Sequence, residues 1–162
     1  MLRMPVLVLA ILLPWSAFAE EDRDTQEINR YVLTEATLTK YVNAVEKLRP
    51  IASQAVSCED DGDDAKSIHE MVTRIDATPA VKAAIQSAGL TTREYVVFGL
   101  SVFQAGMAAW ALDQPGGTLP PGFSKANVDF FNKHKARIEA VKPLDETACD
   151  GSTEEEEEPE ES

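Results

Sequence analysis

The run from Tyr95 to Leu112 (YVVFGLSVFQAGMAAWAL) constrains the fold of this chain most, because it contains no charged residue. Ser101 and Gln104 are its only clearly polar side chains, so a helix formed here is apolar on every side. Such a helix belongs in the middle of a bundle or in a membrane. The run reaches only the lower limit for a membrane span, and amphipathic segments flank it. We therefore expect it to be the central, buried helix of a small soluble all-α domain.

Capping residues mark both ends of this central helix. Thr91 is the expected N-cap, and Glu94 stands three residues later, as a capping box requires. Leu90 and Tyr95 have the spacing of a hydrophobic staple across the same helix start. The sequence 114–117 (QPGG) cannot extend a helix, so we expect the helix to cover about residues 92–113.

Apolar residues at helical spacing predict further helices before the central one. Thr34 is the expected N-cap of a first helix, which ends near Arg49 and Pro50. A second helix carries Ala65, Ile68, Val72 and Ile75 on one face, with Asp63 or Asp64 as its cap. Thr78 and Pro79 begin a short third helix that Gly89 stops. Residues 20–26 are expected to be a flexible arm, and 28–33 a turn or extended piece.

A last helix is predicted after a Pro/Gly-rich connection at 113–123. Ser124 is its expected N-cap, with Phe123 and Val128 as a staple. Its inner face carries Asn127, Phe131, His134, Ile138 and Val141, and Pro143 ends it. Neither repeats nor an alternating strand pattern occur in the sequence. We therefore predict an all-α bundle of four or five helices around the central apolar helix.

Residues 1–19 have the form of a secretory signal peptide. Arg3 supplies the positive charge, residues 5–13 the apolar core, and Ala17-Phe18-Ala19 the cleavage motif before Glu20. The alternative, an N-terminal membrane anchor, is disfavoured because the apolar core is too short. We expect cleavage at Ala19-Glu20 and a periplasmic or secreted mature protein with no membrane span.

The mature chain then divides into a helical domain at 20–150 and an acidic tail at 151–162. The tail has like charges and no apolar residue to bury, so we expect it to be disordered. The formal net charge of the whole chain is −13. An acidic surface argues against nucleic acid and anionic membranes as partners. Solubility alone also explains such a charge.

Two cysteines, Cys58 and Cys149, follow the predicted cleavage site. In an oxidising compartment an even pair predicts a disulfide. Two free thiols or a pair of metal ligands are the alternatives. A zinc site is disfavoured, since neither cysteine has another cysteine or a histidine at ligand spacing.

His134 is the residue with most chemical potential, because it stands between Phe131 and Ile138 on an apolar face. It is a candidate general base, or a ligand of a metal or haem with Met107 as the second ligand. A Met and His pair would resemble periplasmic four-helix b-type cytochromes, with the haem held non-covalently since no C-x-x-C-H motif occurs. The alternative, which we favour, is a structural histidine bonded to a carbonyl or to Gln104. We therefore predict no cofactor.

The other candidate sites are weaker. The acidic turn 58–64 (CEDDGDD) fails the EF-hand register, since position twelve is Ile68 rather than Glu, and it suits a solvated capping turn better. His69 is expected to face solvent. Motifs for phosphate binding, zinc proteases and nucleophile elbows do not occur, so we do not predict an enzyme. Four side chains of the central helix either line a ligand cavity or form ordinary core, the latter being favoured: Phe98, Phe103, Met107 and Trp110.

The segments AGLTTREYVVFGLSVFQAGMAAWAL and GFSKANVDFFNKHKARIEAV, between Ala88 and Val141, carry a resemblance. They are similar to a pattern in uncharacterised short exported all-helical proteins of Gram-negative bacteria. The resemblance implies the fold and the compartment, and it carries no catalytic residue. Together these features predict a binding or interaction module for a protein or small ligand. A haem or metal carrier, or an enzyme, is the alternative.

Overall fold

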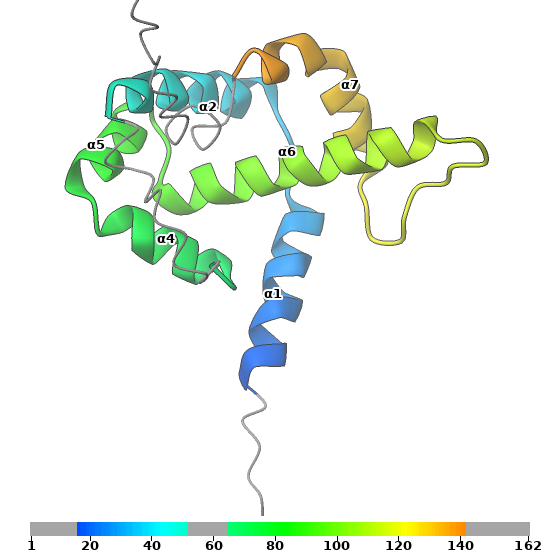
Figure 1. The fold of residues 1–162 in the computed structure, drawn as a ribbon, viewed down its shortest axis with the longest axis horizontal. Coiled ribbons are helices and arrows are strands. Elements are labelled where there is room, and N and C mark those ends of the chain that lie inside the picture. The colour runs from blue at the N-terminus through cyan, green and yellow to red at the C-terminus, as the bar shows by residue number, and fades with distance from the viewer. Residues whose placement is uncertain (1–15, 52–64, 142–162) are drawn as a thin grey trace, which may run out of the picture.

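The computed structural model describes residues 16–51 and 65–141, and all regular elements in these ranges are helices (Figure 1). The predicted all-α fold is therefore confirmed. Six α-helices and one 3-10 turn make up the described part: α1 (Ser16–Arg30), α2 (Glu35–Leu48), η1 (Arg49–Ile51), α4 (Ile68–Asp76), α5 (Pro79–Ser87), α6 (Thr92–Asp113) and α7 (Lys125–Glu139). The predicted signal segment up to residue 15, the acidic turn at 58–64, both cysteines and the acidic tail lie outside the described residues.

α6 is the helix against which the others pack. It crosses the middle of the molecule and contacts α1, α2, α4, α5 and α7 (Figure 1). The predicted capping box is present, because the Thr91 hydroxyl accepts from Glu94 N at 3.1 Å and the Glu94 carboxylate accepts from Thr91 N at 2.8 Å. Leu90 and Tyr95 pack in one cluster, as the staple predicts.

The described residues leave one side of α6 uncovered. Phe98 is completely buried, but Phe103 and Trp110 are each 67% exposed and Met107 is 53% exposed. The prediction that α6 is buried within the bundle is therefore wrong for the face that carries Phe103, Met107 and Trp110. Of the four side chains predicted to form core, only Phe98 does so. By length and composition α6 would suffice to cross a membrane, a property that the core helices of soluble proteins share.

The segment expected to be a flexible arm is part of α1. Three side-chain contacts fasten this helix to α4 and α6: Asp24 Oδ2 with Ile68 N at 2.7 Å, Glu27 with Arg93, and Asn29 Oδ1 with Gln104 Nε2 at 2.7 Å. These contacts depend on residues far away in the sequence, so the local composition of residues 20–26 did not reveal the helix. Tyr31 to Thr34 then form the non-helical link to α2.

Local capping signals predicted most of the other helix starts. Thr34 and Ser124 accept from the backbone N–H of Thr37 and Asn127, as expected for N-caps. Thr78 precedes α5 with Pro79 in the first turn, and Gly89 ends that helix at φ 85°. The start predicted for α4 is wrong. Its cap is the Ser67 hydroxyl, which accepts from Glu70 N at 3.1 Å, while Asp63 and Asp64 lie outside the described residues.

The connection from α6 to α7 folds back against the end of α6. At Gly117 a Cβ atom would stand only 2.1 Å from the Ala111 carbonyl oxygen, so the backbone path requires glycine there. Phe123 and Val128 then pack with Ala108 and Ala109, which confirms the staple at the start of α7. These contacts set α7 alongside the C-terminal half of α6.

Candidate functional site

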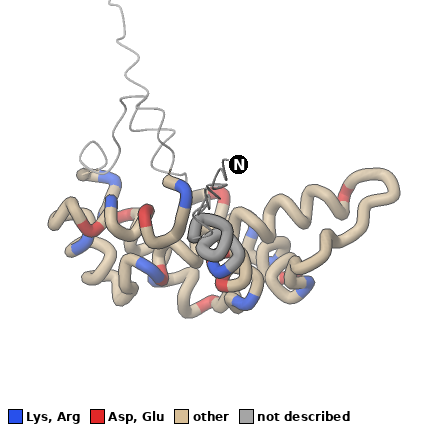
Figure 2. Tube along the Cα trace, turned by 90° about the horizontal axis from the view of Figure 1, so that it is seen from below, with Lys and Arg blue, Asp and Glu red and all other residues tan. Residues whose placement is uncertain are grey.

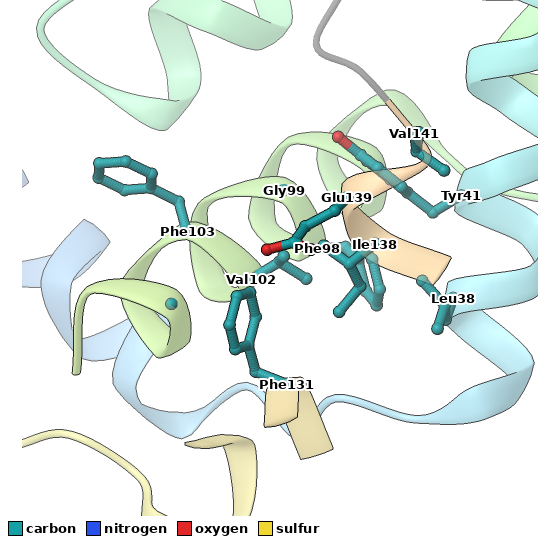
Figure 3. A pocket seen from close by; sticks show the side chains of 11 residues that line it. Leu38, Tyr41, Phe98, Gly99, Val102, Phe103, Phe131, Ile138, Glu139 and Val141 are labelled. Carbon is teal, nitrogen blue, oxygen red and sulfur yellow. The ribbon is translucent and has the colours of Figure 1, made fainter. Parts of the chain in front are cut away.

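A groove of about 550 Å³ lies between α2, α6 and α7 (Figure 3). Small-molecule sites in proteins have volumes of roughly 300–1,000 Å³, so the groove is large enough for a ligand. Eleven of the described residues line it: Leu38, Tyr41, Phe98, Gly99, Val102, Phe103, Gly106, Phe131, Ile138, Glu139 and Val141. Only Tyr41 and Glu139 among them have polar side-chain atoms.

Two glycines of α6 allow aromatic rings to approach the helix closely. At Gly106 a Cβ atom would stand 3.1 Å from the Phe131 ring of α7. At Gly99 it would stand 3.3 Å from the Tyr41 hydroxyl of α2. Because neither glycine carries a side chain, the Tyr41 and Phe131 rings pack directly on α6. Val102 lies between Gly99 and Gly106 in the sequence. The spacing of Gly99 and Gly106 thus shapes the α6 side of the groove.

Contacts between α2 and α7 fix the opposite wall. Leu38, which is 1% exposed, packs in one cluster with Ile138. Arg137 donates to the Thr39 hydroxyl at 3.0 Å, so the two helices are also joined by a polar contact. Arg49, just after α2, donates to the Ala140 carbonyl at 3.4 Å. These contacts therefore hold the C-terminal end of α7 against α2.

Aromatic stacking holds Tyr41 in place. Its ring stacks on Tyr95 with a centroid distance of 4.9 Å and an interplanar angle of 21°. It also contacts the Phe98 ring at 4.8 Å, tilted by 39°. Aromatic pairs at these distances add roughly 0.5–1.5 kcal/mol each beyond the burial of their area. The Tyr41 side of the groove is therefore preformed.

Glu139 is the one charged side chain among the described residues that line the groove. Its side chain comes from the end of α7 and lines the groove (Figure 3). Lys135 lies 3.6 Å away on the same helix, and the two side chains are 58% and 60% exposed. Such an exposed pair contributes only about 0.2–1 kcal/mol, so it does not commit the Glu139 carboxylate to one partner.

A second hollow of about 360 Å³ lies between α4 and α6. It shares Tyr41 and Gly99 with the groove, so the Tyr41 ring stands between the two spaces. Beyond Gly106, the exposed side chains of Met107 and Trp110 continue the apolar surface toward the end of α6. In Figure 2 the part of the chain toward the end of α6, at the right of the view, carries few charged residues.

The two candidate haem ligands, His134 and Met107, lie in different environments. His134 is half-buried on α7, with its ring 4.4 Å from the Phe130 ring, whereas Met107 is exposed on α6. Gln104, an expected partner of His134, donates to Asn29 instead. Within the described residues, His, Asp and Glu side chains do not gather in a group of three or more that could hold a metal ion. His69 is exposed, as predicted.

A ligand cavity lined by Phe98, Phe103, Met107 and Trp110 was the disfavoured alternative to ordinary core, and of these four residues Phe98 and Phe103 line the groove. The sequence also carries a further signal for the groove. Gly99, Phe103, Gly106 and Trp110 follow one another at spacings of four, three and four, and thus share one face of α6. Alternating small and aromatic residues on one helix face indicate hollows beside protruding rings. No protein-family model, curated protein or solved structure matches this chain.

Proposed function

We propose that this protein is an exported binding module whose groove between α2, α6 and α7 takes an apolar small molecule. The observation that carries the proposal is the groove itself, with its volume of about 550 Å³ and its predominantly apolar lining. The signal-like segment at 1–19 supports export, and the acidic composition agrees with a protein that stays in solution.

Burial of an apolar chain drives such binding. Each CH₂ group removed from water contributes about 0.8 kcal/mol, so even a partly covered alkyl chain gives measurable affinity. The Leu38–Ile138 packing and the Arg137–Thr39 hydrogen bond hold the C-terminal end of α7 against α2, which reduces the ordering that binding requires. We therefore expect the ligand to bind with little change in the protein backbone.

The test is a calorimetric titration of the mature protein with decyl maltoside below its micelle concentration. We expect saturable binding with a negative heat-capacity change. Val102→Phe fills the groove and should weaken binding about tenfold or more, through lost volume for the alkyl chain. Val32→Phe makes the same change at a side chain that is 66% exposed and outside the groove, so it should leave the affinity unchanged.

A spectroscopic signal accompanies the titration. The chain has two tryptophans, and removal of the predicted signal segment leaves Trp110 alone. Trp110 lies one helical turn after Gly106 on the same face of α6, so ligand in the groove should change its fluorescence. Absence of saturable binding, or a folded Val102→Phe protein with unchanged affinity, would overturn the proposal.

A further inference from the structure

We infer that the groove selects organic cations with an apolar body, with the positive head beside Glu139. This inference rests on the proposed function and adds the chemical class of the ligand. Its starting point is the charge of the lining, because the described residues that form the groove include one carboxylate and no basic side chain.

The position of Glu139 suits a ligand head group. It comes from the last turn of α7 and its side chain is 60% exposed, whereas Phe98 is fully buried, so the carboxylate lies at the rim of the groove. Its 3.6 Å pair with Lys135 is long and exposed, so a ligand cation can compete for the carboxylate. An alkyl chain would then lie along the apolar floor.

Aromatic rings strengthen the preference for a cation. Four rings line the groove, those of Tyr41, Phe98, Phe103 and Phe131. The faces of such rings attract cations within about 6 Å, an interaction of roughly 0.5–2 kcal/mol depending on exposure. Quaternary ammonium groups are recognised in this way because their charge is spread over methyl groups that also pack against the rings.

Two arginines close to the groove have partners outside it. Arg137 donates to the Thr39 hydroxyl, and Arg49 donates to the Ala140 carbonyl. Lys135 pairs with Glu139 at 3.6 Å but lies outside the described lining, so an anionic head would meet the Glu139 carboxylate with only this long, exposed pair to offset it. The net charge of −13 for the whole chain acts in the same direction, since it attracts cations and repels anions.

The experiment compares three probes that share one alkyl chain: decyltrimethylammonium, decyl maltoside and decyl sulfate. Each is titrated calorimetrically into the mature protein at physiological ionic strength, below its micelle concentration. We expect decyltrimethylammonium to bind about tenfold more tightly than decyl sulfate, with decyl maltoside between them. Equal or tighter binding of decyl sulfate would overturn the inference but leave the apolar groove standing. Failure of all three probes to bind would overturn the proposed function as well.

A pair of variants tests the role of Glu139. Glu139→Gln keeps the shape of the side chain and should weaken decyltrimethylammonium about fivefold while leaving decyl maltoside unchanged. Asp129→Asn is the matched control, because Asp129 also pairs with a lysine four residues away on α7 but lies outside the groove. Unchanged affinity of the Glu139→Gln protein for the cation, or an equal loss in the Asp129→Asn protein, would contradict the inference.

Discussion

Asn127, in the first turn of α7, holds the backbone at Leu33, which lies 94 residues earlier in the chain. Leu33 N donates to Asn127 Oδ1 at 3.1 Å, and Asn127 Nδ2 donates to the Tyr31 carbonyl at 2.8 Å. Asn127 is only 4% exposed, and the bond from Leu33 is buried while the bond to Tyr31 is part-buried. One amide thus joins the link between α1 and α2 to the helix that forms a wall of the groove.

Removal of this amide should destabilise the fold. Asn127→Ala leaves the buried Leu33 N–H without its partner, at a cost of about 1–3 kcal/mol, and the part-buried Tyr31 carbonyl at a smaller cost, so we expect a total loss of about 2–4 kcal/mol. The measurement is urea denaturation of the variant beside Asn132→Ala, an exposed position on the same helix. The control should stay within about 0.5 kcal/mol of the wild type. Equal stability of the two variants would show that the two bonds do not anchor α7.

Gly117 tests the path of the connection between α6 and α7. In the Gly117→Ala protein the new methyl group would overlap the Ala111 carbonyl oxygen, so the backbone has to move. We expect a loss of about 1–3 kcal/mol in the free energy of unfolding, the range for overpacked sites. Thr118→Ala, at the next and exposed position, serves as the control in the same thermal melts. A Gly117→Ala protein as stable as this control would contradict the backbone path.

Asp76 should make the stability of the fold depend on pH. The hydrogen bond from the Thr92 hydroxyl, at 2.6 Å, lowers the pKa of Asp76, and the Lys82 ammonium at 2.9 Å lowers it further. A carboxyl whose folded pKa is depressed stabilises the fold above its unfolded pKa of about 3.9, and this contribution is lost as pH falls through the folded pKa. Wild type should therefore lose its advantage over Asp76→Asn in that acidic window.

The measurement for Asp76 is denaturant unfolding of both proteins at neutral pH and at several acidic pH values. Thr92→Val removes the larger cause of the pKa shift and should reduce the same pH-dependent advantage. A difference between wild type and Asp76→Asn that stays constant across the acidic range would rule out this linkage.

The disulfide between Cys58 and Cys149 stays a prediction, and the described ends of the chain are compatible with it. Arg49 of η1 donates to Ala140, so the segments that lead to the two cysteines leave from neighbouring places. Closing a loop of about 90 residues contributes on the order of 4–5 kcal/mol in the chain-entropy model. Cys58→Ser should lower the melting temperature, with Ser53→Ala as a control outside the bridge. Two titratable thiols in the exported protein would contradict the bond.

Features encoded by neighbouring residues were predictable from the sequence. The caps at Thr34, Thr91 and Ser124 satisfy backbone groups within three residues, so their signals are local. The start of α4 was not predicted, because several acidic residues before Ser67 are equally good caps by composition. Its actual start is also supported by Asp24 of α1, a contact that no local pattern contains.

The position of the groove could not be predicted from the sequence, for a different reason. It depends on how α2 and α7 lie against α6, and these placements are set by distant contacts such as Leu38 with Ile138. The sequence also indicates an apolar central helix without telling which face stays uncovered. Phe98 and Phe103 belong to the same uncharged run, yet the first is fully buried and the second is 67% exposed.

The claim that the groove binds an apolar chain is tested most directly by nuclear Overhauser contacts between bound decyl maltoside and the protein's methyl groups. We expect contacts from the alkyl chain to Leu38, Val102 and Ile138, and none to Val81, a buried residue of α5 that lies outside the groove. Contacts confined to Met107 and other exposed positions beyond the groove, or an absence of contacts at saturating ligand, would contradict it.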